Sequence, residues 1–208
     1  MKLYYYILTI LTAFTAFSCS ESSSTNDNSG FHVSCTYDAS LNRDSATLYF
    51  LEEDYNKLSS AGLCVVKPGN AFEWQGHVTG PKAAFLKLSN DSVPFYFVLE
   101  PGETTIKVHR TSWEINGGQC NKEYTRFMQH RKSIIKEKNK VFNYYLKIAA
   151  DSTLTATTEK DILAQDSILS DSLHRYTAWR MITGGPVAVI ARERFFNTLP
   201  KQYQIKIK

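Results

Sequence analysis

The stretch FYFVLEPGETTIKV, residues 95–108, decides the fold of this chain. Two runs rich in aromatic and β-branched residues flank the sequence Glu100-Pro101-Gly102-Glu103, which is typical of a turn. Proline presets its own φ angle and glycine readily accepts a positive one, so the chain can reverse there at little conformational cost. The stretch therefore predicts two β-strands that are joined by a tight turn.

The same alternation of short apolar runs and turn residues extends over residues 31–115. In the first run Phe31, Val33, Cys35 and Tyr37 alternate with polar residues, which places these four side chains on one buried face. About eight such runs follow one another at the spacing of an antiparallel sandwich or barrel. The predicted strands are FHVSCTY (31–37), ATLYFL (46–51), LCVV (63–66), AFEWQGHV (71–78), AAFLKL (83–88), PFYFVLE (94–100), TTIKVHR (104–110) and SWEI (112–115).

The apolar period changes near residue 120, from two residues to three or four. Residues 121–148 are predicted to form one helix of about seven turns, whose single apolar stripe we expect to pack on the sheet or on neighbouring helices. The opposite face of this helix is basic and is expected to be solvated. The apolar stripe consists of Tyr124, Phe127, Met128, Ile134, Ile135, Phe142, Tyr145 and Ile148.

A second helix is predicted over about 158–182 and begins with acidic residues. The sequence Gly184-Gly185-Pro186 ends it, and Pro186 suits the first turn of a third helix that reaches Phe196. Opposite charges on the first two helices favour an antiparallel pair, although apolar contacts contribute more than exposed ion pairs do. The predicted fold class is α+β, with an N-terminal antiparallel β-sandwich of about eight strands followed by a C-terminal segment of two to three helices.

The first 18 residues, MKLYYYILTILTAFTAFS, are typical of a secretory signal peptide. Lys2 precedes an uncharged apolar run over residues 3–17, which is shorter than the about 20 residues needed to span a bilayer. The segment Ala16-Phe17-Ser18-Cys19 resembles a bacterial lipobox, in which the cysteine becomes the acylated first residue of the mature chain. Cys19 is therefore the predicted lipidation site. Ordinary signal cleavage that leaves Cys19 as an unmodified thiol is the alternative.

Residues 20–30, SESSSTNDNSG, contain no large apolar side chain and are expected to form a flexible tether with an r.m.s. span of roughly 18 Å. An acylated Cys19 would anchor the chain to membrane lipid. We therefore expect the folded part to lie outside the cytoplasm in a bacterial cell envelope, with the outer membrane favoured. The predicted organisation is a signal peptide (1–18), a lipidated tether (19–30), a β-sandwich domain (31–120) and a helical extension (121–208).

The charge balance argues against a nucleic-acid partner. The formal net charge is only +4, and no Lys/Arg run is interleaved with aromatic residues as a phosphate-binding groove requires. Besides Cys19 the chain has Cys35, Cys64 and Cys120, which allow at most one internal disulfide in an oxidising compartment. The sequence does not choose the pair. Cys35 and Cys64 are expected in buried strands, whereas Cys120, polar-flanked and near a helix start, is the expected accessible thiol.

Residues 31–127 resemble the domain of unknown function 4369, a family whose members are commonly envelope lipoproteins. The family pattern contains a V-x-x-G-x-F-x-F-x-G hairpin, matched here over residues 66–76 with Ala71 as an extra residue and Trp74 in place of phenylalanine. It also contains an F-x-L-E-x-G-x-I signature, matched by Phe97-Val98-Leu99-Glu100-Pro101-Gly102, which runs into Ile106. The resemblance implies a packed β domain with a helical extension and implies no activity.

Members of this family often carry a thioredoxin-like domain with a W-C-x-x-C motif after the helices, and this chain contains no C-x-x-C. We predict no catalytic, metal-binding or cofactor-binding residues, although His32, His77 and His109 fall on the polar sides of strands and could converge on zinc. The chain is expected to be a non-catalytic, lipid-anchored module that binds or positions an unidentified envelope protein or ligand. The alternative is a truncated or split relative of a thiol-disulfide oxidoreductase.

Overall fold

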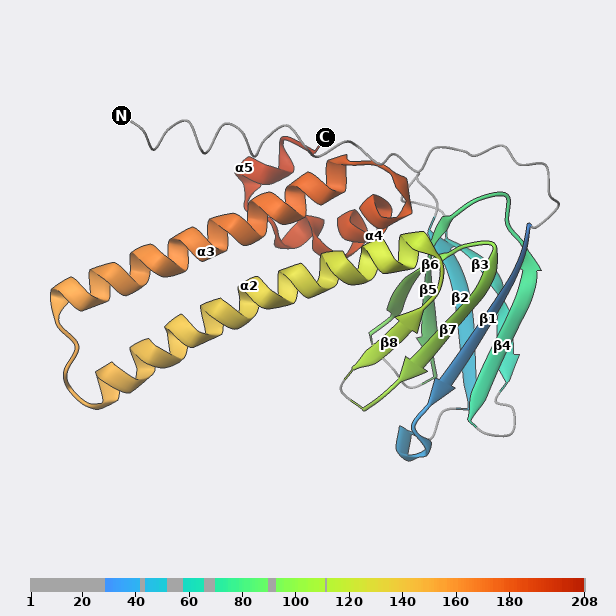
Figure 1. Cartoon of the computed structure of the whole chain (residues 1–208), viewed down its shortest axis with the longest axis horizontal. Helices are drawn as coiled ribbons and strands as arrows, with labels where there is room; N and C mark the ends of the chain where they lie inside the picture. The colour runs from blue at the N-terminus through green and yellow to red at the C-terminus, as the bar shows by residue number, and fades with distance from the viewer. Residues whose placement is uncertain are drawn as a thin grey trace.

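In the residues that the structure describes, eight strands form two four-stranded sheets, and a group of helices follows them in the sequence (Figure 1). The predicted α+β class, with strands before helices, is confirmed in this computed structural model. The structure describes residues 29–41, 44–51, 58–65 (backbone only), 70–89, 93–110 and 112–207. The strands are β1 (Gly30–Tyr37), β2 (Ser45–Leu51), β3 (Leu58–Val65), β4 (Ala71–His77), β5 (Lys82–Leu88), β6 (Phe95–Leu99), β7 (Gly102–Val108) and β8 (Trp113–Asn116), with the 3-10 helix η1 (Ala39–Leu41) after β1.

One sheet has the strand order β4-β1-β7-β8 and the other has the order β3-β2-β5-β6. Neighbouring strands are antiparallel except β1 and β7, which run parallel with Cys35 opposite Ile106. The expectation of an antiparallel sandwich is therefore wrong for this one pair. The turn at Gly102 carries the chain from β6 in one sheet to β7 in the other, and its φ of 98° is a conformation that favours glycine.

The family pattern implies a hairpin over residues 66–76, of which 66–69 lie outside the described residues; β3 before them and β4 after them belong to different sheets. β4 pairs instead with β1, with Val33 opposite Trp74 and Cys35 opposite Phe72. Alternation along a strand reports which residues face the core, and it is satisfied by any pairing partner that keeps the register. The predicted strand over residues 71–78 is confirmed as β4, and its pairing with β1 was not predicted.

The long helices α2 (Gln119–Ala150) and α3 (Ala156–Ile182) form an antiparallel hairpin that projects from the sandwich (Figure 1). Thr155 caps α3, since its hydroxyl accepts a hydrogen bond from the Thr158 amide at 3.2 Å. Gly184 at φ 76° follows α3, and Pro186 lies in the first turn of α4 (Gly185–Phe195). The three predicted helices are confirmed. The short η2 (Phe196–Thr198) and α5 (Lys201–Gln204), which were not predicted, complete the described chain.

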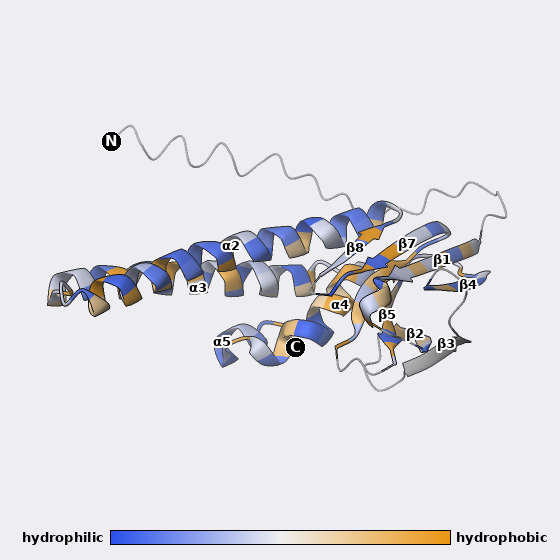
Figure 2. Cartoon of the chain, turned by 90° about the horizontal axis from the view of Figure 1, so that it is seen from below, coloured by the Kyte–Doolittle hydropathy of each residue, from blue (hydrophilic) through white to orange (hydrophobic). Residues whose placement is uncertain are grey.

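The C-terminal elements α4, η2 and α5 cover only the part of the hairpin nearest the sandwich (Figures 1 and 2). We call this part the proximal half, residues 119–134 and 171–182. The distal half, residues 135–150 and 156–170, extends beyond these elements. In the described part of the chain, no helix is long and apolar enough to cross a membrane.

The predicted apolar stripe of α2 is buried only in the proximal half. Phe127 is 2% exposed and Tyr124 is also buried, whereas Phe142 is 58% exposed and Ile135 is 40% exposed. The expectation that Ile135 and Phe142 would pack on the sheet or on neighbouring helices is therefore wrong. The physical reason is length, because α2 and α3 extend beyond α4, η2 and α5, the elements that cover them.

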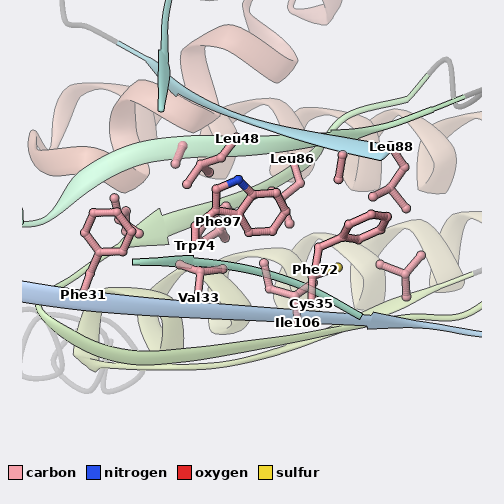
Figure 3. Packing of buried hydrophobic residues seen from close by; sticks show 14 of the residues in the cluster. Phe31, Val33, Cys35, Leu48, Phe72, Trp74, Leu86, Leu88, Phe97 and Ile106 are labelled. Atoms are coloured by element: carbon pink, nitrogen blue, oxygen red, sulfur yellow. The ribbon is translucent and has the colours of Figure 1, made fainter. Parts of the chain in front are cut away.

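The space between the two sheets is filled by apolar side chains from both (Figure 3). Phe31, Val33, Cys35 and Tyr37 are all buried, as the alternation in β1 predicts. Full burial of a large apolar side chain contributes about 1.5–3 kcal/mol, so this core supplies much of the stability of the sandwich. Its other large members include Leu48, Phe72, Trp74, Leu86, Leu88, Phe97, Leu99 and Ile106.

Candidate functional site

The junction between the sandwich and the helices is built on the carboxylate of Glu100. Its Oε1 accepts a hydrogen bond from the Cys120 amide at 2.9 Å, and its Oε2 accepts one from the Asn121 amide at 3.0 Å. The N-cap residue of α2 is Gly118, which has no side chain to cap the helix. Glu100, buried in the turn before β7, therefore satisfies the first helix amides and places a negative charge at the positive end of the helix dipole.

Asn121 and two glycines complete this junction. The Asn121 side chain donates to the Val98 carbonyl at 2.6 Å and accepts from the Val98 amide at 2.9 Å, so it pairs with strand β6 as another strand would. A Cβ atom on Gly118 would lie 2.6 Å from Oε1 of Glu100, and one on Gly117 would lie 2.7 Å from the Asn121 side chain. The glycines allow the close approach that lets one carboxylate hold the helix against the sheet.

Two arginines lie among aromatic rings where α4 meets α2 and the sheet. The guanidinium of Arg194 is 5.2 Å from the ring centroid of Tyr96 and 5.8 Å from that of Trp113. The guanidinium of Arg131 is 3.8 Å from the ring centroid of Phe195. Burial, together with the charge of Arg194, lowers the pKa of Arg131 to about 10, which leaves it charged at neutral pH. The contacts of Arg194 attach α4 to the sheet, and the contact of Arg131 attaches α2 to α4.

A shallow depression of about 690 Å³ lies on the surface of α3, next to His130 of α2. The ring of Tyr176 forms part of its wall, with centroids 4.2 Å from His130 and 5.9 Å from Trp179. Trp179 is 54% exposed and offers a flat apolar surface to solvent. We call His130, Ile168, Tyr176 and Trp179 the aromatic surface. The depression is lined by His130, Ser167, Ile168, Asp171, Ser172, Arg175 and Tyr176.

The carboxylate of Asp171 is the acidic group of this depression, and it already has two partners. The Arg175 guanidinium lies 2.6 Å from it, and the Tyr203 hydroxyl donates a hydrogen bond to it. Burial and the nearby charge of Lys138 lower the pKa of His174, which contacts the Tyr203 ring. The arrangement offers aromatic faces, hydroxyls and one ion pair, which are groups suited to noncovalent binding of a partner.

The three strand histidines do not converge. His77 lies beside the start of β1, where it shares a 3.2 Å hydrogen bond with Ser29. His109 lies at the other end of β1, 3.4 Å from Asp38. Within the described ranges, no group of three His, Cys, Asp or Glu residues could hold a metal ion.

The described cysteines are both enclosed. Cys35 faces the sandwich core, where burial raises the pKa of its thiol to about 12. Cys120, in the first turn of α2, is 3% exposed, so the expectation that it is accessible is wrong. Its polar sequence neighbours did not reveal that the first turn of α2 packs against the sheet. Cys19, the predicted lipidation site, and the side chain of Cys64 lie outside what the structure describes.

The fold and the junction define a β-sandwich domain that holds the helix following it, α2, through the carboxylate of Glu100 in the turn between β6 and β7. The family model described as domain of unknown function (DUF4369) matches residues 31–124. This match covers the sandwich and the start of α2, and it confirms the resemblance found in the sequence. The match includes Glu100, Gly118 and Asn121 of the junction. No curated protein matches the chain.

Proposed function

We propose that this chain is a non-catalytic, lipid-anchored module of a bacterial cell envelope that binds or positions a partner outside the cytoplasm. The anchor is supported by the sequence, in which an apolar run ends at Cys19 and a polar stretch over residues 20–30 follows it. The outer membrane is the favoured location. The partner is an envelope protein or ligand, and the charge balance speaks against nucleic acid.

The observation that carries the binding role is the exposed aromatic surface on α3. Trp179 is 54% exposed and Ile168 is 69% exposed, and the two lie eleven residues, or about three turns, apart on the same side of the helix. Large apolar side chains that gather on the surface of a folded domain mark contact sites. Arg175 and Asp171 lie beside them and supply the polar groups that give a contact its specificity.

The settings of the thiols favour this role over that of a shortened thiol-disulfide oxidoreductase. Exchange requires an accessible thiolate, whereas Cys35 has a pKa of about 12 and Cys120 is enclosed. We expect insulin reduction by dithiothreitol to proceed at the uncatalysed rate in the presence of the protein. A faster rate that disappears in the Cys120→Ser variant would favour the oxidoreductase.

The anchor is tested by Cys19→Ala in the producing bacterium. We expect an unprocessed precursor and loss of partitioning into the detergent phase, because the acyl chains hold the protein to the membrane. Cys35→Ala, which removes a thiol and leaves the leader intact, serves as the matched control and should still partition. Wild-type protein that is found unlipidated in the aqueous phase would overturn the anchor.

The binding role is tested by a photo-reactive side chain at Ser172, inside the depression, with cross-linking in envelope preparations. We expect a defined product whose yield falls at least about tenfold in Trp179→Ala, since exposed tryptophans are frequent anchors of interfaces. Ile205→Ala removes a comparably exposed apolar residue that does not line the depression, and it should leave the yield unchanged. Equal yields in both variants would show that the aromatic surface does not bind the partner.

A further inference from the structure

We propose that one exposed face of α2, which we call the docking face, binds anionic phospholipid headgroups. This goes beyond the acyl anchor, because it gives the folded part its own contact with a lipid surface. The proposed function enters only in stating which membrane the docking face would meet. The docking face consists of four lysines and three large apolar residues: Lys132, Ile135, Lys136, Lys140, Phe142, Leu146 and Lys147.

The docking face is continuous and contains no acid. At 3.6 residues per turn, its seven residues fall within about 160° of the helix circumference. Every residue of α2 from Lys132 onward that lies in this sector is exposed, and none of them is Asp or Glu. Hydrophilic colour predominates along α2 in Figure 2, with apolar residues between the polar ones toward the far end.

The charges of this face are largely uncompensated. Lys140 has one partner, the exposed Glu137, at 2.8 Å. Two acidic residues of α3 pair with other cations: Asp166 with Lys138 at 3.3 Å, on the side of α2 that meets α3, and Asp171 with Arg175 at 2.6 Å. Among the described residues, the other three lysines of the docking face have no carboxylate within 4.0 Å. The face therefore presents a row of positive charge about 22 Å long, because Lys132 and Lys147 are 15 residues apart and each residue adds a rise of about 1.5 Å.

The apolar residues distinguish this face from an ordinary solvated one. Ile135, Phe142 and Leu146 are 40%, 58% and 49% exposed. They succeed one another at seven and four residues, so they form a strip along the helix beside the lysines. Solvation explains exposed lysines and does not explain the strip. Lysines next to exposed Phe and Leu on one helix are the composition by which helices lie in the plane of a membrane interface.

An anionic bilayer complements both parts of the docking face. Its headgroups supply negative charge to the lysines, and the layer beneath them accepts the apolar side chains. A second copy of the chain that packed through the same face would bring lysines against lysines without a carboxylate. The chemistry therefore favours lipid over self-association.

Vesicle flotation tests this proposal with the full chain carrying Cys19→Ala, which has no acyl group. The apolar leader is present in every sample, so the readout is the ratio of binding to mixed phosphatidylglycerol/phosphatidylcholine vesicles over phosphatidylcholine vesicles. We expect a ratio of at least about ten at low salt, because each lysine near an anionic surface contributes about a fivefold factor. The ratio should approach one near about 1 M salt, where the Debye length is about 3 Å.

Two variants of equal charge make the test specific. Lys132, Lys136, Lys140 and Lys147 changed together to Glu should remove the preference, whereas exposed Lys87, Lys107, Lys160 and Lys201 changed together to Glu should keep it. Phe142→Ser should weaken binding to anionic vesicles several-fold and leave its salt dependence unchanged.

Equal ratios in the two four-lysine variants, or a wild-type ratio of one, would overturn the proposal. A wild-type dimer in sedimentation that the docking-face variant dissociates, without any vesicle preference, would show an interface between copies instead. The vesicle ratio does not depend on acylation. Failure of Cys19 to be lipidated in the cell would therefore disprove the anchor and leave the docking face standing.

Discussion

The two halves of the α2–α3 hairpin carry apolar residues at the same helical spacing but have different surroundings. In the proximal half, Phe127 and Met181 are buried together with residues of α4 and of the sheet. In the distal half only the seam between the two helices is buried, through Val141 and Ile162, while Phe142 faces solvent. An apolar period thus identifies a stripe on a helix, and the length of the covering elements decides how much of that stripe becomes core.

This difference has a consequence for local stability. The proximal half is held by a cluster that spans the sheet, both long helices and α4, whereas the distal half is held by a narrow seam. Regions with few buried apolar contacts open locally at a lower free energy than the whole protein unfolds. We expect amide exchange in the distal half to be faster than in the proximal half of the same two helices.

The largest expected effect comes from one substitution made in each half. Phe127→Ala should lower the free energy of unfolding by about 3–5 kcal/mol, because it removes a ring from a packed cluster and leaves a cavity. Phe142→Ala should change it by no more than about 0.5 kcal/mol, since the ring is mostly exposed. Urea denaturation measures both. Equal losses would show that a partner or a second copy covers Phe142 in solution.

The second effect concerns the junction on which the proximal half depends. Glu100→Ala should cost about 2–4 kcal/mol, because it leaves buried donors of Cys120 and Asn121 without an acceptor. Glu103→Ala, three residues along the same turn and exposed, should cost less than about 0.5 kcal/mol. Exchange of the first amides of α2, followed by mass spectrometry, should accelerate only in Glu100→Ala. Unchanged protection there would mean that the carboxylate does not cap the helix.

The strands could be predicted because their signal is local. Alternating burial in β1 and β4 follows from residue types two positions apart, and it holds at Phe31, Val33 and Trp74. The pairing of strands could not be predicted, because the same alternation fits any neighbour. The parallel contact of β1 with β7 joins residues about 70 positions apart, and no local pattern reports it.

The junction was missed for a related reason. The sequence marks Glu100 as part of a turn, but its role depends on Cys120 and Asn121 twenty residues later. Gly117 and Gly118 directly precede α2, and their close approach to the capping groups becomes evident only in three dimensions. A glutamate directly after an apolar strand, followed by a glycine pair before a predicted helix, is the sequence signal that could have found the junction.

The third effect is a pH dependence of the free energy of unfolding that arises in the sandwich core and not in the hairpin. The thiol of Cys35 has an ordinary pKa of 9.0 that burial raises to about 12, so the unfolded chain loses this proton at lower pH than the folded chain. Stability therefore falls as pH rises above about 9, by about 1.4 kcal/mol per pH unit until about pH 12.

The comparison of wild type with Cys35→Ala isolates this contribution, because other titrating groups are common to both chains. Urea denaturation should show that the stability advantage of wild type shrinks by roughly 1.3 kcal/mol between pH 10 and pH 11, midway between the two pKa values. Local exchange in the distal half should be equal in the two proteins at each pH. A constant advantage across this range would mean that the folded thiol ionises as readily as the unfolded one.

The smallest expected effect is the coupling energy of an ion pair in the distal half, and it tests whether charge or apolar packing stabilises that half. Lys138 on α2 lies 3.3 Å from Asp166 on α3, and both side chains are partly exposed. Such pairs contribute about 0.2–1 kcal/mol, so a double-mutant cycle with Lys138→Ala and Asp166→Ala should give a coupling in that range. The readout is the free energy of local opening from native-state exchange, because global unfolding is dominated by the sandwich and the proximal half.

The Lys140–Glu137 pair, which lies within α2, is the matched control and should not change the opening of α3. A coupling above about 2 kcal/mol for the interhelical pair would mean that the distal half is held by charge, and that the apolar seam of Val141 and Ile162 is secondary.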